Sequence, residues 1–327
     1  MNESWPRKCA VVGVGTMGAG FAQLLSLAGV PCAVADQSVE VAEEGRSRAI
    51  ARVAEYEARG LVPAGATRDA SALILRGQDI GTAVRDADLV LEAVAEDPAV
   101  KRDVLTTIEA SVAPEAVIAT NTSAIPIREL AGALDRPQRF LGAHWFNPPQ
   151  WVPCVEVVPG PDTDPVVVEW IHGFLLRLGK KPVTVGDRAG FVANRLQFAM
   201  FKEAVAVVDE GVATPEEVDA VVKGSFGFRL PLSGPFLIAD MNGLDVYAGA
   251  YEALENEHGP RFAVPESVRQ RVRAGRLGFK RGDGFYPMPE EGLDDLTLRR
   301  DGAYAALTQF LDGLSPLEGS GAPGADD

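Results

Sequence analysis

Two residues twelve positions apart have the types needed to move a proton. His144, one of only three histidines, lies in GAHWFNPP (142–149) between a glycine and a proline-rich turn. Glu156 lies in the apolar run CVEVVPG (154–160), where a lone carboxylate is costly unless it finds a partner. A carboxylate that accepts from one imidazole nitrogen leaves the other nitrogen free to take the proton of a substrate hydroxyl. The intervening turn can bring the pair together, although spacing alone slightly favours a structural histidine.

A glycine turn indicates a second kind of chemistry, the binding of a dinucleotide. VVGVGTMG places Gly13, Gly15 and Gly18 after an apolar run and before a helical pattern. This spacing allows a tight turn, close approach of the backbone to a pyrophosphate, and a helix N-terminus aimed at the phosphates. Asp36 ends the next predicted strand, where a carboxylate accepts from both ribose hydroxyls and repels a 2′-phosphate. The pattern therefore predicts NAD rather than NADP; glycines that serve only a turn are the alternative.

The overall composition restricts the partners and the compartment. The formal net charge is −15 and the sequence pI is about 4.7, which argues against nucleic acid or an anionic membrane as a partner. Cys9, Cys32 and Cys154 are odd in number and lack disulfide or zinc spacing, which predicts a reducing, cytoplasmic location and no metal site. Residues 10–35 are uncharged like a signal peptide or membrane helix, but their five glycines and Pro31 disfavour one continuous helix.

The elements that must position these residues alternate between short apolar strands and helices. Strands are predicted at 8–15, 31–36, 87–94, 116–123, 139–146, 154–160 and 181–187. Helices are predicted at 16–29, 38–60, 98–112 and 164–178. Such alternation is typical of a mainly parallel α/β sheet, so the predicted fold class is α/β with a Rossmann-type, NAD-binding domain over residues 1–187.

The pattern changes after the last predicted strand. AGFVANRLQFAMFKEAVAVVDEG (189–211) is apolar on nearly all sides until its last turn and is expected to be buried between neighbours. Thr214 and Glu217 form a capping-box pattern, and helical patterns follow. We therefore expect an all-helical domain over 188–290, to which the family resemblance described below assigns substrate binding and dimerisation. An extension over 291–327 has one amphipathic segment and a composition that cannot build a core at its end, which predicts disorder there.

Several motifs together resemble the 3-hydroxyacyl-CoA dehydrogenase family. They are the glycine turn at 13–18, EAVAEDPAVK at 92–101, NTS at 121–123, GAHWFNP at 142–148, VEVV at 155–158, GFVANR at 190–195, GPFLIADMNGLD at 234–245 and GFYPM at 284–288. They follow the family's order over about 8–290. The resemblance implies an NAD-dependent oxidoreductase of fatty acid metabolism with a Rossmann domain, a helical C-terminal domain and dimerisation through the latter.

The resemblance also implies roles for particular residues. His144 becomes the catalytic base and Glu156 its orienting partner, while Ser123 and Asn194 hydrogen-bond the reacting oxygen of the substrate. The residues implied on the cofactor side of the cleft are Gly13, Gly15, Thr16, Met17, Gly18, Asp36, Glu96, Lys101 and Asn121.

Some of these roles have structural alternatives. Ser123 can instead cap the helix that includes Pro126. Glu96 and Lys101 can form an exposed pair near a helix start. Asn194 is harder to explain structurally, because a buried amide needs partners.

The sequence departs from the family pattern at the substrate end. Ala124 replaces a serine often found after NTS, so contacts near a thioester are expected to differ. NPPQWVPCVE (147–156) resembles the hydroxy-acid branch of the superfamily, which includes gulonate and carnitine dehydrogenases and lambda-crystallin, whereas NTS favours acyl-CoA enzymes. Cys154 shares a strand face with Glu156, but nothing nearby suggests an activated thiolate, so a cysteine hydrolase is disfavoured.

A group of arginines leaves the binding of CoA open. Arg48, Arg52 and Arg59 fall on one helical face and can meet a phosphate. However, pairs of Arg48 with Glu44 and of Arg59 with Glu55 have the i,i+4 spacing of salt bridges. A self-satisfied, solvated face is therefore at least as good an interpretation.

The leading hypothesis is hydride transfer between NAD and the 3-hydroxyl of a 3-hydroxyacyl-CoA such as 3-hydroxybutyryl-CoA, with His144 as general base. The same chemistry on a free small hydroxy acid is the second hypothesis, and a non-catalytic, crystallin-like NAD-binding protein is the third. The expected partners are a small-molecule substrate and a second copy of the chain, without nucleic acid or membrane. A homodimer is expected because the apolar helices of the second domain predict more burial than one chain provides.

Overall fold

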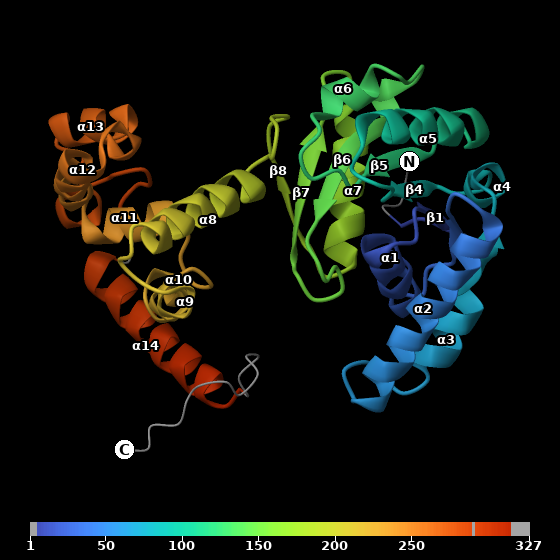
Figure 1. Cartoon of the computed structure of the whole chain (residues 1–327), viewed down its shortest axis with the longest axis horizontal. Helices are drawn as coiled ribbons and strands as arrows, with labels where there is room; N and C mark the ends of the chain where they lie inside the picture. Colours follow the sequence, from blue (N-terminus) through green and yellow to red (C-terminus); the bar gives the residue numbers. More distant parts are fainter. Residues whose placement is uncertain (1–4, 290–291, 315–327) are drawn as a thin grey trace. The chain divides into compact units, whose positions relative to one another are not determined.

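The structure, a computed structural model, describes residues 5–289 and 292–314 (Figure 1). The chain divides into two compact units, Met1–Lys202 and Glu203–Asp327, and the division falls within one helix. The first unit is built on a sheet, and the described elements of the second are helical, as predicted. Within the described residues, no helix is both long enough and apolar enough to cross a membrane.

An eight-stranded sheet organises the first unit, in the order β3-β2-β1-β4-β5-β6-β7-β8. The strands are β1 (Cys9–Val12), β2 (Cys32–Ala35), β3 (Ile74–Gln78), β4 (Leu89–Glu92), β5 (Val117–Thr120), β6 (Phe140–Trp145), β7 (Cys154–Pro159) and β8 (Lys181–Thr184). Neighbours from β3 to β6 are parallel, β7 is antiparallel to β6, and β8 is parallel to β7. The predicted mainly parallel α/β sheet is confirmed.

Helices cover both faces of this sheet (Figure 1). One face carries α1 (Thr16–Leu27), α2 (Val39–Ala58), α3 (Ala66–Leu73) and α7 (Pro165–Arg177); the other carries α4 (Ile80–Val84), α5 (Pro98–Ser111) and α6 (Ile127–Ala131), and a 3₁₀ turn (Pro137–Arg139) precedes β6. In β1, Cys9 and Val11 join the first hydrophobic cluster, whereas Ala10 and Val12 join the second. Burial on both faces explains why most strands are continuous apolar runs.

Two elements differ from the sequence prediction. β3 is not predicted, because this edge strand is only partly buried and includes the exposed Arg76. α8 (Ala193–Asp209) begins later than the apolar pattern, because the backbones of Gly190 and Phe191 are left-handed, with φ of 72° and 46°. No side chain of α8 is buried. The expectation that this helix is buried between neighbours is therefore wrong for the described structure.

The second unit contains α9 (Pro215–Gly224), α10 (Phe226–Arg229), α11 (Pro235–Asn242), α12 (Leu244–His258), α13 (Glu266–Arg273) and α14 (Gly292–Asp312), with 3₁₀ turns at Pro260–Phe262 and Phe279–Arg281. The predicted capping box is confirmed: the Thr214 hydroxyl accepts from the Glu217 N–H, and the Glu217 carboxylate accepts from the Thr214 N–H. Asp240 is fully buried and accepts from the N–H groups of Phe285 and Tyr286, so it joins two of the sequence motifs.

Candidate active site

The candidate base and its carboxylate face each other across two neighbouring strands. His144 on β6 is the register partner of Glu156 on β7. His144 Nδ1 and Glu156 Oε2 are 2.7 Å apart, and each residue is 3% exposed. Phe146 and Phe191 lie against the imidazole, with ring centroids 4.6 and 5.6 Å away. The carboxylate thus fixes Nδ1–H, and Nε2 has no hydrogen-bond partner in the part of the chain that is described.

The start of α8 holds the other oxygen of Glu156. This oxygen, Oε1, accepts from the N–H groups of Val192 (3.0 Å) and Ala193 (2.9 Å). The preceding Phe191 is buried and left-handed, a strained backbone conformation that aims these groups at the carboxylate. Burial acts to raise the pKa of Glu156, but the bonds from His144 and both N–H groups prevail, so the pKa lies below its ordinary value. Glu156 therefore stays ionised beside the imidazole.

Asn194, in the first turn of α8, holds the loop that carries Ser123. Its Nδ2 donates to the backbone carbonyl of Ser123 over 3.1 Å. This loop follows β5, which is parallel to β6, so Ser123 lies at the same edge of the sheet as His144. Among residues 5–289 and 292–314, nothing bonds the Ser123 hydroxyl. The helix-cap alternative is wrong, because the Asp187 carboxylate accepts from the first N–H groups of α6.

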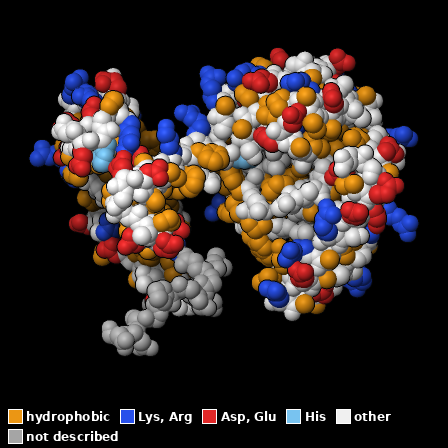
Figure 2. Space-filling model, viewed as in Figure 1, with side chains coloured by type: hydrophobic (Ala, Val, Ile, Leu, Met, Phe, Trp, Pro, Cys, Tyr) orange, Lys and Arg blue, Asp and Glu red, His pale blue; other side chains and the backbone are white. Residues whose placement is uncertain are grey.

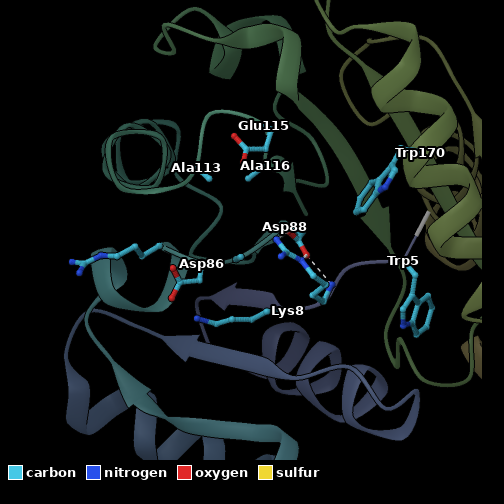
Figure 3. A pocket seen from close by; sticks show the side chains of 11 residues that line it. Trp5, Lys8, Asp86, Asp88, Ala113, Glu115, Ala116 and Trp170 are labelled. Carbon is cyan, nitrogen blue, oxygen red and sulfur yellow. Dashed lines mark hydrogen bonds and ion pairs between the residues drawn. The ribbon is translucent and has the colours of Figure 1, made fainter. Parts of the chain in front are cut away.

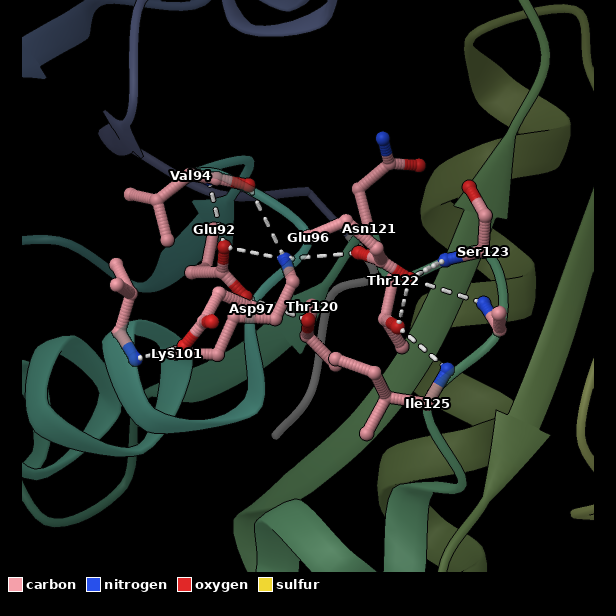
Figure 4. A network of polar contacts seen from close by, with 12 residues as sticks. Glu92, Val94, Glu96, Asp97, Lys101, Thr120, Asn121, Thr122, Ser123 and Ile125 are labelled. Atoms are coloured by element: carbon pink, nitrogen blue, oxygen red, sulfur yellow. Dashed lines mark hydrogen bonds and ion pairs between the residues drawn. The ribbon is translucent and has the colours of Figure 1, made fainter.

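Glu96 fixes the backbone of the same loop (Figure 4). Its Oε1 accepts from the Thr122 hydroxyl (2.7 Å) and from the N–H groups of Ser123 (2.8 Å) and Ala124 (3.0 Å). Burial acts to raise the pKa of Glu96, but these bonds and the charge of Lys101 bring the pKa below its ordinary value. Glu96 is therefore ionised and holds Ser123 in place.

Lys101 does not line the cleft, which corrects the prediction for this residue. Its side chain is fully buried, and Nζ lies 2.8 Å from Glu92 Oε1 and 3.6 Å from Glu96 Oε2 (Figure 4). The exposed-pair alternative is wrong for the same reason. Glu92 ends β4 in an apolar run, and its Oε2 accepts from the Thr120 hydroxyl (2.5 Å). Lys101 is the internal counter-ion that this buried carboxylate requires.

Asn121 lies at the carboxyl end of β5, half-buried. Its Oδ1 accepts from the Trp145 N–H (2.9 Å), so it ties the end of β5 to the end of β6, where His144 lies. Glu92 is not among the predicted site residues, although a carboxylate within the apolar run ADLVLEAV is the same signal that marks Glu156. By contrast, nothing in the sequence marks Phe191 as a site residue, because a phenylalanine does not indicate a left-handed backbone in the way that a glycine does.

The glycine turn between β1 and α1 fits a dinucleotide. Gly13 is left-handed (φ 88°), and a Cβ there would lie 2.6 Å from the Ala93 carbonyl carbon; a Cβ on Gly18 would collide with the Gly13 carbonyl oxygen. Gly15, in contrast, has open space where a Cβ would stand. As the N-cap of α1 it brings no side chain to the first N–H groups, which are left for phosphate oxygens.

Asp36 stands at the end of β2, next to this turn. One of its oxygens accepts from the Val14 N–H (2.7 Å) and the other from the Gln37 N–H (2.8 Å). Each oxygen keeps a lone pair for a ribose hydroxyl. Thr16, exposed, and Met17, half-buried, begin α1 beside the turn. The turn, the first residues of α1 and the acid thus form one cradle whose chemistry suits a dinucleotide with unphosphorylated ribose.

A separate cavity of about 650 Å³ lies at the opposite edge of the sheet (Figure 3). Its lining includes Trp5 and Lys8 before β1, Asp86 and Asp88 before β4, and Glu115 before β5. Ligands of open α/β sheets bind at the carboxyl ends of the strands. This cavity lies at their amino ends and is therefore not part of the candidate site.

Comparison with known proteins agrees with this geometry. The chain is 34% identical over 309 residues to a 5-formyl-3-hydroxy-2-methylpyridine 4-carboxylate 5-dehydrogenase from Mesorhizobium japonicum. The aligned region covers 94% of this chain and 99% of the relative. This chain is also 36% identical over 283 residues to a 3-hydroxybutyryl-CoA dehydrogenase from Mycobacterium tuberculosis, and that alignment covers 86% of this chain and 98% of the relative. The crystal structure of a 3-hydroxyacyl-CoA dehydrogenase from Archaeoglobus fulgidus matches with a TM-score of 0.75 at 31% identity, over 94% of this chain and 99% of that chain.

Models of one family cover both parts of the chain. The 3-hydroxyacyl-CoA dehydrogenase NAD binding domain matches residues 8–188. The 3-hydroxyacyl-CoA dehydrogenase C-terminal domain matches residues 190–288. With the dinucleotide cradle and the histidine–carboxylate pair in the first of these regions, the chain belongs to the 3-hydroxyacyl-CoA dehydrogenase family of NAD-dependent oxidoreductases.

Proposed function

We propose that the chain oxidises the 3-hydroxyl of a 3-hydroxyacyl-CoA to a ketone, with NAD as acceptor and His144 as general base. The observation that carries the proposal is the 2.7 Å contact between His144 Nδ1 and Glu156 Oε2. The pair is almost closed to solvent and lies near Ser123, at the carboxyl ends of β5 and β6. Relatives named 3-hydroxybutyryl-CoA dehydrogenase, at 36% identity, support this substrate class.

Each residue of the pair has a separate task in this chemistry. His144 Nε2 accepts the hydroxyl proton as the carbonyl forms. NAD, when bound, supplies the nicotinamide carbon that accepts the hydrogen and the electron pair from the carbinol carbon. Glu156 stabilises the imidazolium and, because its pKa is low, does not take the proton itself. In the reverse direction, protonated His144 polarises the ketone.

Two further side chains serve the oxygen of the substrate. The Ser123 hydroxyl is free to donate, and Asn194 has a second Nδ2 hydrogen besides the one on the Ser123 carbonyl. Both donors stabilise the negative charge that builds on the oxygen as its proton leaves. Glu96 keeps Ser123 in place from the other side of the loop through the bonds described above.

The arginine face of α2 is partly self-satisfied. Arg52, rather than the predicted Arg59, pairs with Glu55 at 2.7 Å. Arg48 donates to the Val14 carbonyl beside the glycine turn, over 3.2 Å. Arg59 has no hydrogen bond or ion pair with any described residue. In our proposal, Arg59 is therefore the guanidinium of this face that remains for a CoA phosphate.

A free acid is the second candidate substrate. The Mesorhizobium relative, named for a pyridine carboxylate, matches 94% of this chain, compared with 86% for the Mycobacterium tuberculosis 3-hydroxybutyryl-CoA dehydrogenase. The greater coverage does not separate the candidates, because the Archaeoglobus 3-hydroxyacyl-CoA dehydrogenase also matches 94%.

The test combines a substrate panel with one substitution. NAD reduction is measured with (S)-3-hydroxybutyryl-CoA, with free 3-hydroxy acids and with 5-formyl-3-hydroxy-2-methylpyridine 4-carboxylate, the compound for which the Mesorhizobium relative is named. His144→Gln is expected to lower kcat by about 10²- to 10⁴-fold while NADH affinity stays within about threefold. His172→Gln, the same change at a histidine on α7, is the matched control and should keep full activity. Turnover confined to free acids would reject the acyl-CoA substrate, and an active His144→Gln would reject the base.

We also propose that the chain is a homodimer formed through its second unit. The described cluster of buried hydrophobic residues there has four members, Ala239, Leu244, Val264 and Val268. Large apolar side chains from the α9–α11 region are exposed, as are others on the visible face of this unit in Figure 2. We name six of these residues the α9–α11 surface: Val212 just before α9, and Val221, Phe226, Leu230, Leu232 and Phe236 from α9 to α11. Exposed apolar area of this kind favours association with a partner that offers a similar apolar surface, and a second copy of the chain is such a partner.

The location and the domain boundaries complete the proposal. We propose a cytoplasmic protein, since Cys9, Cys32 and Cys154 are free thiols and burial raises the pKa of Cys32 to about 12, which keeps it unreactive. We propose functional domains at 1–187 and 188–290, followed by an extension, because the two family models divide between 188 and 190. The compact units divide later, at Lys202, because α8 runs on from the first unit.

A further inference from the structure

Lys180 is a buried cation outside the proposed chemistry. It lies between α7 and β8 and is 5% exposed. Its Nζ donates to three backbone carbonyls, those of Pro149 (2.6 Å), Gln150 (3.1 Å) and Val152 (3.0 Å). No carboxylate of the described residues forms an ion pair with it, and burial lowers its pKa. A cation placed in this way must have a specific task, because its burial costs free energy.

The three carbonyls belong to the loop between β6 and β7 (146–153). Three prolines in this loop, Pro148, Pro149 and Pro153, have no N–H. The Pro148 carbonyl accepts from the N–H groups of Trp151 and Val152, whereas no backbone N–H of the described residues reaches the three carbonyls that Lys180 binds. An ammonium group has three donors, and here each donor has one carbonyl. Lys180 thus supplies the donors for three carbonyls that lack a backbone partner, and it fixes the shape of the loop.

The loop joins the two parts of the proposed site. At one end it continues into β6 and β7, which carry His144 and Glu156. On its other side it packs on α1, the helix that begins at the glycine turn. A Cβ on Gly20 would lie 2.5 Å from Pro149 Cγ, and Gln150 donates to the side chain of Gln23. The loop therefore sets the spacing between the imidazole and the helix that faces the dinucleotide.

We propose that Lys180 is a positioning residue for catalysis, which holds the 146–153 loop so that His144 and the NAD-binding helix α1 keep a fixed separation. The inference rests on the proposed function, because it assumes that His144 acts on a substrate beside NAD. Loss of Lys180 should lower the turnover number of active sites that are still correctly folded, because a small displacement of a catalytic base lowers the reaction rate by a large factor.

The test is Lys180→Met in the full-length enzyme, which keeps an unbranched side chain only one atom shorter than lysine and removes all three donors. Lys181→Met is the matched control, because Lys181 is the adjacent residue and its side chain is exposed. We measure NADH-binding sites by fluorescence titration, kcat per titrated site, and Tm. Lys180→Met should lose about 10- to 100-fold in kcat per site. Lys181→Met should match the wild type.

The outcomes separate this inference from a structural role and from the proposed function. Fewer NADH-binding sites with wild-type turnover per site would overturn the inference, because Lys180 would then serve folding alone. Wild-type behaviour of Lys180→Met would also overturn it. If Lys180→Met does not fold, Lys180→Gln, which keeps an amide donor, is measured by the same criteria. An active His144→Gln refutes the proposed base, whereas an inactive His144→Gln beside a fully active Lys180→Met refutes only the positioning role.

Discussion

The sheet unit and the helical unit bury apolar side chains to very different extents. In the sheet unit, helices cover both faces, and two large buried clusters include most strand residues. In the helical unit, the described cluster has four buried members, whereas the α9–α11 surface is exposed. Burial of apolar area is the main favourable term in folding. The sheet unit thus has the core of an independent domain, whereas the helical unit leaves a larger part of its apolar side chains exposed.

The same comparison separates the chemistry from the assembly. Every residue placed in the candidate site precedes the division at Lys202, and each buried carboxylate of the sheet unit (Glu92, Glu109 and Glu156) has a basic partner there. Substitutions at these positions should change turnover or the stability of the single chain. Substitutions on the α9–α11 surface should change the oligomeric state. A site variant that changed only the oligomeric state, or an α9–α11 surface variant that changed only turnover, would contradict this division.

The largest effect is expected from Glu156→Gln. The amide of glutamine would donate to imidazole Nδ1, which forces the proton of His144 onto Nε2 and removes the base. We expect kcat to fall by about 10³- to 10⁴-fold, or about 4–5.5 kcal/mol in transition-state stabilisation. Steady-state kinetics measures this, and sedimentation velocity should show an unchanged dimer. A loss below tenfold would show that the carboxylate does not set the tautomer.

This variant also tests the low pKa of Glu156. A carboxyl with a folded pKa below its unfolded value, about 4.3, contributes stability that is complete above that value and is lost as pH falls through the folded pKa. The difference in unfolding free energy between wild type and Glu156→Gln should therefore shrink as pH falls from 6 to below 4. A difference that stayed constant over this range would contradict the pKa assignment.

The next effect is on the stability of the sheet unit. Lys101→Met leaves Glu92 as a buried charge without its counter-ion and should lower the unfolding free energy by about 3–5 kcal/mol. Because the pair is internal to one chain, the loss should not depend on protein concentration. Denaturant titrations at two protein concentrations measure both points. The double variant Glu92→Gln/Lys101→Met removes both charges and should recover part of the loss; no recovery would argue against the ion pair as the cause.

The smallest effect is expected on assembly. Val221→Lys introduces a charge on the α9–α11 surface and should weaken the dimer by about tenfold in Kd, or about 1.4 kcal/mol. Leu176→Lys on α7 is the matched control, because Leu176 is 61% exposed and Val221 is 64% exposed. Sedimentation equilibrium distinguishes the two variants. Equal dimer affinities would place the interface elsewhere, and a monomeric wild type at micromolar concentration would end the dimer proposal.

The elements and the cofactor cradle could be read from the sequence because their signals are local. Apolar runs alternating with helical periodicity specify a mainly parallel sheet, and the predicted ranges of α2, α5 and α7 agree with the structure to within a few residues. The glycines at 13, 15 and 18 and Asp36 act within one strand–turn–helix–strand unit, so their spacing along the chain is close to their arrangement in space. β3 has no clear signal in the sequence because it is an edge strand that is only partly buried, so it does not need a continuous apolar run.

The environment of each polar side chain was decided only by the tertiary structure. Lys101 and Glu96 look equivalent in EAVAEDPAVK, yet one is wholly buried against Glu92 and the other binds the Ser123 loop. Glu156 receives its second set of bonds from Val192 and Ala193, 36 and 37 residues further along the chain. Contacts at such separations depend on how the strands and α8 are packed together. Sequence periodicity therefore determines which residues lie in which element, whereas protonation and hydrogen-bond partners depend on burial and distance, which exist only in the folded chain.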